Sequence, residues 1–555
     1  MTPTLIQRRI GFLFALFLLL MVIAGGRALQ LALFQGSRLA DAATSQQRQD
    51  LKVPAARGTI SDRSGVALAV AEAADDVSAT PYLVEDPRSA ARAIAPLLGR
   101  PESEVLDQLS RRDTGFVYLA RSLPASRAEK IRELGIAGID LAATQRRVYP
   151  RGFSASQLLG FVNADGKGAA GLEYGLDSTL RGRDGMRRIV RDGVGDDITV
   201  RDVAPARPGR GVQLTIDAAI QAQAEKVLRD VGSTYRPKGA TAIVTDPQSG
   251  EVLALANWPQ IDANHPGRSP AWANTNRAVS FTYEPGSTFK SFTVAAALEE
   301  GEVTPDTSFN LAPTLTLYDR TLHNNEDRGW ATMTTADILA KSDNVGAATI
   351  GIKLGKERFD RWTRRFGFGR PTGVQLPGEE RGIVMPVEKY SGTSMLNLPL
   401  GQGQSVTPMQ MMAAYGAIAN GGVLRRPQVV RAVGGKRVAA GAGRRVISER
   451  TSAQIRTMLE GVLAEGGTAA AVKVKGFKLA GKTGTANKIE PDGTYSESKY
   501  VASFVGFAPA ESPKLLISVV VDEPSQGSIY GGAIAAPAFG RIAEYALQYL
   551  RIPPS

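Results

Sequence analysis

The chain contains, near its middle, the stretch Tyr283-Glu284-Pro285-Gly286-Ser287-Thr288-Phe289-Lys290-Ser291-Phe292. Pro285 and Gly286 interrupt the preceding backbone, and apolar residues then recur at helical spacing as far as Gly301. The sequence therefore predicts a turn that runs into a helix, with Ser287 in the first helical turn. Backbone N–H groups there have no partner within the helix, and the helix dipole favours negative charge.

Lys290 follows Ser287 by three residues, which places both side chains on one face of the predicted helix. A serine hydroxyl becomes a nucleophile when a base lies within hydrogen-bond reach. The pKa of a lysine falls among apolar neighbours, so Lys290 could be that base. A single Ser-x-x-Lys motif is common in long chains and is ordinarily a solvated pair on a helix, so the interpretation needs further motifs.

Two later stretches supply them. Lys341-Ser342-Asp343-Asn344-Val345-Gly346 ends a predicted helix over residues 334–340, and Gly481-Lys482-Thr483-Gly484-Thr485-Ala486 opens a strand-like run. Ser-x-x-Lys, Ser-Asp-Asn and Lys-Thr-Gly, in this order, are the motifs of penicillin-binding proteins and serine β-lactamases. Three ordered motifs are far more specific than any one of them.

Composition excludes several other kinds of site. The 555 residues are 43% hydrophobic and 22% charged, which is typical of globular domains, and they include no cysteine. Disulfides and thiolate sites are therefore excluded, and two histidines, His265 and His323, are too few for a three-histidine metal site. We expect no metal and no cofactor. No G-x-S-x-G elbow surrounds Ser287, so a lysine base is a simpler hypothesis than a histidine base.

The net charge of +12 favours anionic surroundings such as a membrane or a cell-wall polymer. Nucleic acid is not an expected partner, because no basic helix with interleaved aromatic residues is present. Residues 1–9, which end in Arg8-Arg9, are predicted to be a cytoplasmic tail, and residues 10–32 a transmembrane anchor. The alternative is a signal peptide cleaved near Ala24-Gly25-Gly26, but its apolar region would be long for that class.

Residues 33–210 are predicted to form a separate, elongated, mixed α/β pedestal. Amphipathic helices are expected at 86–98 and 102–111, and an extended hairpin at 187–200. The run Gly166-Lys167-Gly168-Ala169-Ala170-Gly171 matches the dinucleotide pattern G-x-G-x-x-G. It lacks the surrounding βαβ unit, so we interpret it as a glycine-rich turn.

Residues 211–555 are predicted to be the catalytic domain, of the α+β class. A hairpin is expected from strands at 241–245 and 251–256, and three adjacent antiparallel strands at 478–488, 500–508 and 514–522. A helix over 537–550, with Pro537 in its first turn, would close the domain. Together these elements predict a central antiparallel sheet of about five strands covered by helices.

Over nearly its whole length the chain resembles the class B penicillin-binding proteins, which are membrane-anchored peptidoglycan D,D-transpeptidases. Arg57–Gly65, Arg147–Pro150 and Gly171–Glu173 are similar to motifs of the family's N-terminal region. Glu284-Pro285-Gly286 and Ser503–Pro509 are similar to the cell-division branch, the penicillin-binding protein 3 type. Ser291 departs from that branch, which often has proline there. Asp343 is more familiar from class A β-lactamases.

The resemblance implies a role for each site residue. Ser287 would attack the carbonyl between two terminal D-alanines, Lys290 would activate it, and the backbone N–H groups of Ser287 and Thr485 would form the oxyanion hole. Ser342 would pass a proton to the leaving D-alanine, and Asn344 would hold the substrate amide. Lys482 would supply positive charge and lower the pKa of Lys290. The set that would bind the carboxylate end of the substrate is Thr483, Gly484 and Thr485, with Gly484 leaving room for the peptide.

The resemblance also implies partners and a location. The expected substrates are peptidoglycan stem peptides, with β-lactams as covalent inhibitors. No glycosyltransferase-like segment is recognised, so a membrane glycan polymerase and other division proteins are expected partners. The chain would cross the inner membrane once, with its catalytic domain outside the cytoplasm. The alternatives are an elongation-type transpeptidase, a β-lactamase or β-lactam sensor, and a non-catalytic scaffold of the division machinery.

Overall fold

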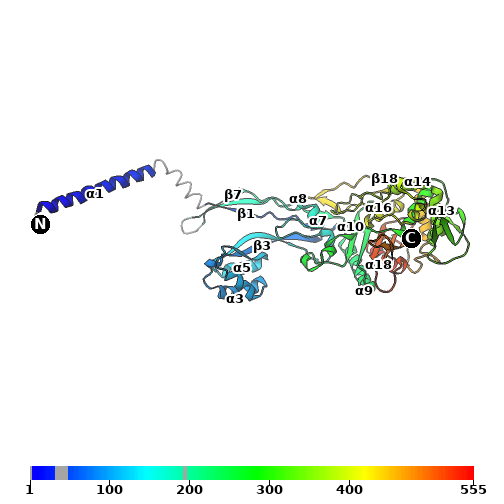
Figure 1. The fold of residues 1–555 in the computed structure, drawn as a ribbon, viewed down its shortest axis with the longest axis horizontal. Coiled ribbons are helices and arrows are strands. Elements are labelled where there is room, and N and C mark those ends of the chain that lie inside the picture. Colours follow the sequence, from blue (N-terminus) through cyan, green and yellow to red (C-terminus); the bar gives the residue numbers. More distant parts are fainter. Residues whose placement is uncertain (1–2, 32–47, 192–196, 555) are drawn as a thin grey trace.

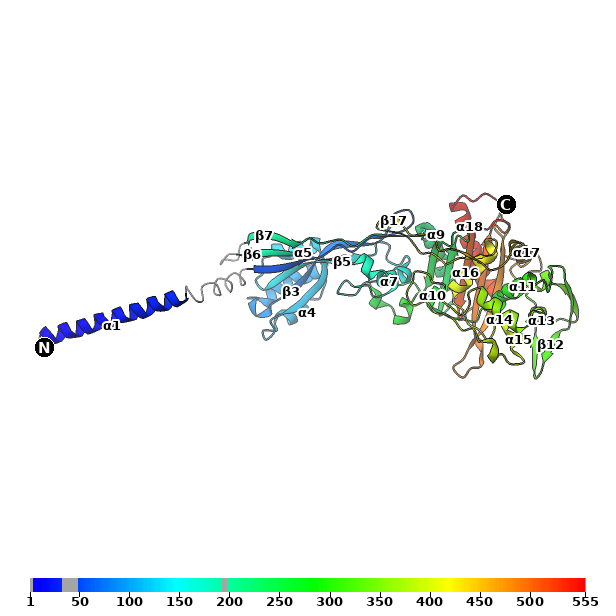
Figure 2. The same cartoon turned by 90° about the horizontal axis from the view of Figure 1, so that it is seen from above.

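The structure is a computed structural model that describes residues 3–31, 48–191 and 197–554. The molecule is elongated, with helix α1 at one end, a slender mixed region in the middle and a broad domain of helices and strands at the other end (Figures 1 and 2). The first two residues of the predicted tail, residue 32 of the predicted anchor and residues 33–47 of the predicted pedestal lie outside the described residues.

Helix α1 (Pro3–Gln30) is long and apolar enough to cross a membrane. Its candidate span, Gln7–Gln30, is 24 residues long with a mean hydropathy of 2.3, and none of its apolar window is buried in the protein. A core helix of this composition would be covered by other elements, whereas α1 leaves its apolar side chains exposed. The helix therefore has the length and composition that a membrane span requires.

The pedestal is organised on the long strand β3 (Ala67–Ala79). Strands β4 (Val117–Pro124) and β5 (Ile139–Val148) pair with β3 in antiparallel fashion. Helices α3 (Pro87–Leu98), α4 (Glu102–Leu109) and α5 (Ala125–Glu133) pack against these strands and bury a core of their own. Both amphipathic helices are thus confirmed, and Asp86 caps the first of them through the N–H groups of Arg88 and Ser89.

A three-stranded antiparallel sheet extends from the pedestal toward the α1 end. Its strand order is β1-β6-β7, from β1 (Arg48–Val53), β6 (Gly185–Arg191) and β7 (Asp197–Ala204). The predicted hairpin at 187–200 is confirmed in its paired strands, while its turn at 192–196 lies outside the described part of the chain. The G-x-G-x-x-G run begins in a turn over residues 163–166, pairs with Val162 through Gly168 and ends at Gly171, the first residue of α7 (Gly171–Gly175). Gly166 and Gly171 are at positive φ.

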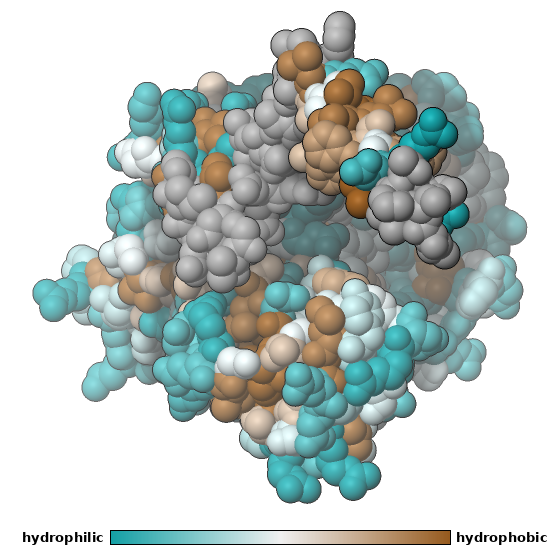
Figure 3. All heavy atoms as spheres, turned by 90° about the vertical axis from the view of Figure 1, so that its left-hand side faces the viewer, coloured by the Kyte–Doolittle hydropathy of each residue, from teal (hydrophilic) through white to brown (hydrophobic). Residues whose placement is uncertain are grey.

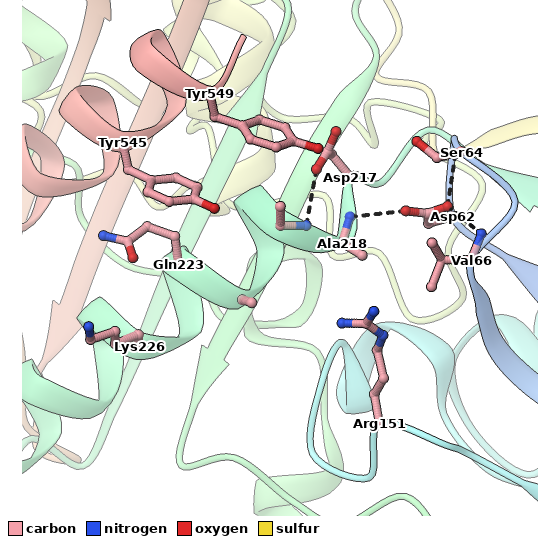
Figure 4. Close-up of a pocket in the computed structure, with 12 residues that line it drawn as sticks. Asp62, Ser64, Val66, Arg151, Asp217, Ala218, Gln223, Lys226, Tyr545 and Tyr549 are labelled. Atoms are coloured by element: carbon pink, nitrogen blue, oxygen red, sulfur yellow. Dashed lines mark hydrogen bonds between the residues drawn. The ribbon is translucent and has the colours of Figure 1, made fainter.

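A single sheet crosses from the pedestal into the catalytic domain. Strand β2 (Ile60–Ser61) pairs with β3 and, in parallel, with β8 (Val212–Leu214), which pairs with β16 (Val430–Val433). Beside this junction the buried Asp62 carboxylate accepts hydrogen bonds from Val66 N–H in the pedestal and from Ala218 N–H at the start of α9 (Figure 4). A cavity of about 400 Å³ opens here between the pedestal, α9 and α18.

The catalytic domain contains a five-stranded antiparallel sheet of order β10-β9-β21-β20-β19, as predicted. Its strands are β9 (Gly239–Thr245), β10 (Val252–Trp258), β19 (Ala480–Ile489), β20 (Tyr495–Ala508) and β21 (Leu515–Asp522). Helices α9 (Ala218–Tyr235) and α18 (Gly531–Tyr549) pack together against it, and α16 (Pro408–Ala419) and α17 (Glu449–Glu460) contact β21 and β19. Helices thus cover the sheet, as Figure 2 shows.

Smaller elements complete the domain around the motif helices. The motif helices are α11 (Lys290–Glu299), α12 (Thr335–Ala340) and α13 (Asn344–Leu354). The remaining helices include α10 (Arg277–Ser280), α14 (Lys356–Arg365) and α15 (Ser394–Asn397). Short hairpin strands are β11 (Ser308–Leu311), β12 (Thr314–Leu317), β13 (Arg320–His323) and β14 (Ala331–Thr334).

The predicted start of the last helix is wrong. Helix α18 begins at Gly531, so Pro537 lies inside it rather than in its first turn. Proline cannot donate to the carbonyl four residues earlier, and that carbonyl, on Ala533, accepts a hydrogen bond from the Tyr235 hydroxyl instead. Gly531 is required at the start, because a Cβ there would collide with backbone carbonyls of β19 and β20.

A buried charge cluster holds the pedestal strands to the segment before β6. The Glu173 carboxylate pairs with Arg57 Nε at 2.7 Å and with Arg147 Nε at 2.6 Å. Arg57 also pairs with Asp177, whose pKa is lowered by hydrogen bonds from Gly168 N–H and Arg57 despite partial burial. The side chains of Glu173, Arg147 and Arg57 are 0%, 2% and 7% exposed, so each charge depends on its partners for solvation.

We expect Glu173→Gln to destabilise the protein by about 3–5 kcal/mol, because it leaves two buried guanidinium groups without their shared carboxylate. The measurement is the thermal or urea unfolding of the full chain. The matched control is Glu72→Gln, which breaks an exposed Arg–Glu pair on β3 and β5 and should cost at most about 1 kcal/mol. Equal effects of the two changes would contradict the structural role of the cluster.

Candidate active site

Ser287 lies in a short 3-10 helix, Gly286–Phe289, that leads directly into α11. The sequence predicts that Ser287 lies in the first turn of an α-helix, whereas the structure places it in the tighter 3-10 turn just before α11. Residues three apart are eclipsed in a 3-10 helix, so Ser287 and Lys290 still lie in line. Gly286 has φ +54°, and a Cβ there would press against β19, so this position requires glycine. The Tyr415 hydroxyl stabilises this turn by donating a hydrogen bond to the Thr288 carbonyl at 2.7 Å.

Lys290 is fully buried, and its amine reaches the second motif. Lys290 Nζ lies 2.6 Å from the Ser342 carbonyl, 2.6 Å from Asn344 Oδ1 and 3.3 Å from Ser342 Oγ. Burial lowers the pKa of Lys290 to about 7, against a smaller opposing effect of the Asp343 carboxylate. An amine with this pKa is partly neutral at neutral pH, and only the neutral form can take a proton.

The second motif is a strained loop between α12 and α13. Ser342 has φ +61°, which is uncommon for a residue other than glycine. Asp343 caps α13 through the Gly346 N–H at 2.7 Å and pairs with the Arg328 guanidinium at 2.6 Å. The Asn344 N–H donates to Asn324 Oδ1 at 2.6 Å. These contacts fix the direction in which Ser342 and Asn344 face Lys290.

The third motif lies on β19, the edge strand of the sheet. It is next to the short 3-10 helix Gly286–Phe289, which we call the nucleophile turn after the predicted role of Ser287. Lys482 is completely buried, and its pKa is lowered by burial and by the charge of Lys290. The repulsion between the two lysine charges is mutual, so it favours loss of a proton from the pair. Thr483 Oγ1 lies 2.7 Å from Thr468 Oγ1, and Thr485 Oγ1 accepts a hydrogen bond from Gly531 N–H at 3.1 Å.

Gly484 lies where β19 approaches the turn that carries Ser287. Side chains alternate along a strand, so position 484 faces the opposite way from Thr483 and Thr485. A Cβ on Gly484 would collide with Ser503 Oγ and approach Thr288 and the Pro285 carbonyl. The glycine therefore lets β19 pack closely against the turn that carries Ser287.

The sequence gives little indication of the residues that support the motifs. Asp343 is the exception, because an aspartate just before a helix is a common cap. Arg328, Asn324 and Tyr415 come from segments distant in sequence, and no local pattern indicates their contacts with the motifs.

Residues 240–544 match the family model described as the penicillin binding protein transpeptidase domain, and residues 52–214 match the penicillin-binding protein dimerisation domain. The chain belongs to the class B penicillin-binding proteins. This class B penicillin-binding protein is 34% identical to stage V sporulation protein D of Bacillus subtilis over 570 residues, 99% of this chain and 87% of the relative.

Two further similarities cover the same length. Peptidoglycan D,D-transpeptidase FtsI of Escherichia coli is 31% identical to this penicillin-binding protein, over 99% of this chain and 93% of the relative. The crystal structure of penicillin binding protein 3 from Mycobacterium tuberculosis complexed with ampicillin matches with a TM-score of 0.73 and 31% identity. The match covers 91% of this chain and 97% of that one. The predicted fold class and the family resemblance are therefore confirmed.

We expect acylation of this penicillin-binding protein by a β-lactam to rise with pH through about 7. The lysine must lose its proton to act as a base, so the rate should fall on the acid side, where Lys290 is charged. Because the two lysines interact, the midpoint belongs to the pair. The measurement is the second-order acylation rate from pH 6 to 8, with the melting temperature followed over the same range as a control. A flat rate profile over a constant melting temperature would contradict a lysine base.

Proposed function

We propose that this protein is a peptidoglycan D,D-transpeptidase that cross-links stem peptides through an acyl-enzyme on Ser287. The observation that carries the proposal is the convergence of the three motifs, with the buried Lys290 amine 2.6 Å from Asn344 Oδ1 and 3.3 Å from Ser342 Oγ. The names of the relatives, which include peptidoglycan D,D-transpeptidases, support the same activity. A β-lactam would enter the site as a stable acylating analogue, as the ampicillin complex of the similar structure suggests.

The first half of the reaction forms the acyl-enzyme. Lys290 in its neutral form takes the proton of Ser287 Oγ, which attacks the carbonyl between the two D-alanines. The backbone N–H groups of Ser287 and Thr485 stabilise the negative oxygen of the tetrahedral intermediate. The proton then passes by way of the Ser342 hydroxyl to the leaving D-alanine nitrogen.

The remaining site residues bind the substrate. Thr483 and Thr485 hold the terminal carboxylate, and Asn344 holds the amide of the stem peptide. Burial keeps the pKa of Lys482 low in the free enzyme, and an arriving carboxylate would favour its charged form. In the second half, an amine from a neighbouring stem peptide attacks the acyl-enzyme and releases Ser287. The chemistry requires no metal and no cofactor.

Three variants test these roles. Ser287→Ala should abolish covalent labelling by a fluorescent penicillin while the fold is retained. Lys290→Arg should also abolish acylation, because arginine does not lose its proton in proteins. Lys482→Arg supplies a permanent positive charge for the carboxylate and should leave measurable acylation, with a gap between the two lysine variants on the order of 10²–10⁴-fold. Labelling of Ser287→Ala at the wild-type rate, or equal rates for the two arginine variants, would contradict the mechanism.

We also propose residues 1–9 as a cytoplasmic tail, 10–32 as the anchor, 33–210 as the pedestal and 211–555 as the transpeptidase domain. The catalytic domain would lie outside the inner membrane. The form Glu284-Pro285-Gly286 supports a role in division rather than in elongation. Depletion in the source organism distinguishes these two, since loss of a division enzyme gives filaments and loss of an elongation enzyme gives round cells.

The pedestal would dock a membrane glycan polymerase and other division proteins. Apolar side chains are exposed on the β1-β6-β7 sheet, among them Val200 at 54% and Val203 at 46%. Seen from the α1 end, apolar (brown) surface lies among polar (teal) surface (Figure 3). Exposed apolar side chains on this sheet are candidate contacts for such a partner.

Replacing Val200 and Val203 together by aspartate should leave penicillin acylation unchanged but abolish complementation of growth. The control is Leu83→Asp, an exposed apolar position elsewhere on the pedestal that is 52% exposed. Full complementation by the double variant would place the docking surface elsewhere, and loss of complementation by the control would indicate a general effect of added charge.

A further inference from the structure

Glu284 is a buried acidic residue next to the nucleophile turn for which the mechanism above has no role. It lies three residues before Ser287 and is 8% exposed. Its Oε1 accepts a hydrogen bond from the Gly403 N–H at 2.8 Å and one from the Tyr495 hydroxyl at 3.3 Å. Its Oε2 is buried without a hydrogen-bond partner among the described residues. Burying a carboxyl group with one unpaired oxygen lowers the stability of the fold, and a functional role for Glu284 would explain this cost.

The two partners of Glu284 come from different elements. Gly403 lies in the loop before α16, which also contacts the nucleophile turn, because Gly286 N–H donates to the Gly401 carbonyl at 3.1 Å. Tyr495 begins β20 and pairs with Ile489, the last residue of β19. Glu284 is therefore a direct side-chain link between the turn that carries Ser287 and the hairpin that carries Thr485.

This link joins the two halves of the oxyanion hole. One N–H donor comes from Ser287 on the turn and the other from Thr485 on β19. The chain between the two donors runs from residue 288 to residue 484, so no short covalent segment fixes their separation. Their spacing depends on packing, and a donor displaced from the developing charge loses much of its stabilising effect.

We propose that Glu284 is a positioning residue, which holds the β19–β20 hairpin against the nucleophile turn and so sets the geometry of the oxyanion hole. This inference rests on the proposed roles of Ser287 and Thr485. Glu284 touches no reacting atom and acts through Tyr495 and Gly403. It should affect the chemical step, in which the oxyanion forms, more than the initial binding of substrate or inhibitor.

The electrostatic surroundings of Glu284 favour its neutral form. Burial raises the pKa of Glu284, against smaller opposing effects of the bonds from Gly403 N–H and Tyr495. The titratable group that faces it is Tyr495, and Arg320 on β13 acts on Tyr495 in turn. Glutamine has the shape of the neutral acid and keeps the same acceptor oxygen. Glu284→Gln should therefore preserve the link, whereas Glu284→Ala removes it.

The test separates the acylation rate constant from the binding constant for a fluorescent penicillin, using rapid kinetics on the full chain. We expect Glu284→Ala to lower the acylation rate constant about 10-fold, less than the 10²–10³-fold loss of a whole oxyanion donor, with inhibitor binding nearly unchanged. Glu284→Gln should stay near the wild-type rate. Tyr495→Phe should show part of the loss, and the double variant Glu284→Ala with Tyr495→Phe should be no slower than Glu284→Ala alone.

The matched control is Glu490→Gln, an acid on the same hairpin that pairs with Lys499 and should not affect the rate constant. An unchanged rate constant in Glu284→Ala, or a change confined to inhibitor binding, would overturn the proposal. If Glu284→Ala does not fold, the acylation rate constant of Tyr495→Phe tests the proposal instead, because that change removes only one hydroxyl group. If the proposed function is wrong, the fluorescent penicillin would still label Ser287→Ala, and this outcome is distinct from any effect of the Glu284 variants.

Discussion

The geometry of the site depends on the hydrogen bonds that the buried Lys290 amine makes. The amine enters the protein interior at the start of α11 and finds its acceptors on the Ser342–Asn344 loop. An amine without such partners would be very unfavourable at this depth, so the hydrogen bonds fix the helix and the loop relative to each other. The same burial lowers the pKa of Lys290, so one physical cause serves both the structure and the chemistry.

The rest of the catalytic domain holds this contact from two sides. Beneath α11, aromatic rings pack at centroid distances of 5.0–5.4 Å, from Phe289, Phe292, Phe366, Phe368 and Tyr415. On the other side, Arg328 pairs with Asp343 and restrains the strained Ser342 loop. Glycine at position 484 allows β19 to approach the nucleophile turn directly. The site is thus a set of rigid elements in close contact, which is the arrangement that preorganised catalysis requires.

The pedestal is joined to this domain by backbone pairing as well as by side chains. Strand β2 lies between β3 of the pedestal and β8 of the catalytic domain, so hydrogen bonds of one sheet run through the junction. The buried cluster of Glu173, Arg57 and Arg147 locks the neighbouring segments. A partner bound to the pedestal would therefore act on elements that are continuous with the catalytic domain, rather than on a flexibly tethered module.

The sequence by itself determined the apolar N-terminal helix, the strands of the central sheet and the residues of the three motifs. These features are local: they depend on periodicity, turn residues and short spacings, which a chain displays before it folds. It also predicted a lowered pKa for Lys290, because apolar residues recur around it in the sequence as well as in space. The start of α18 was not predictable from the sequence, because it depends on the Gly531 contact with β19 and β20, which lies outside the helix.

Only the tertiary structure decided how the motifs are supported and what several residues do. The direction of Gly484, the Arg328–Asp343 pair and the link from Glu284 to Tyr495 each join segments far apart in sequence. Burial and pKa shifts likewise depend on the sum of all neighbours, so no local pattern gives them. The physical reason is common to these cases: residue types specify which interactions are available, and packing of the whole domain selects which of them are made.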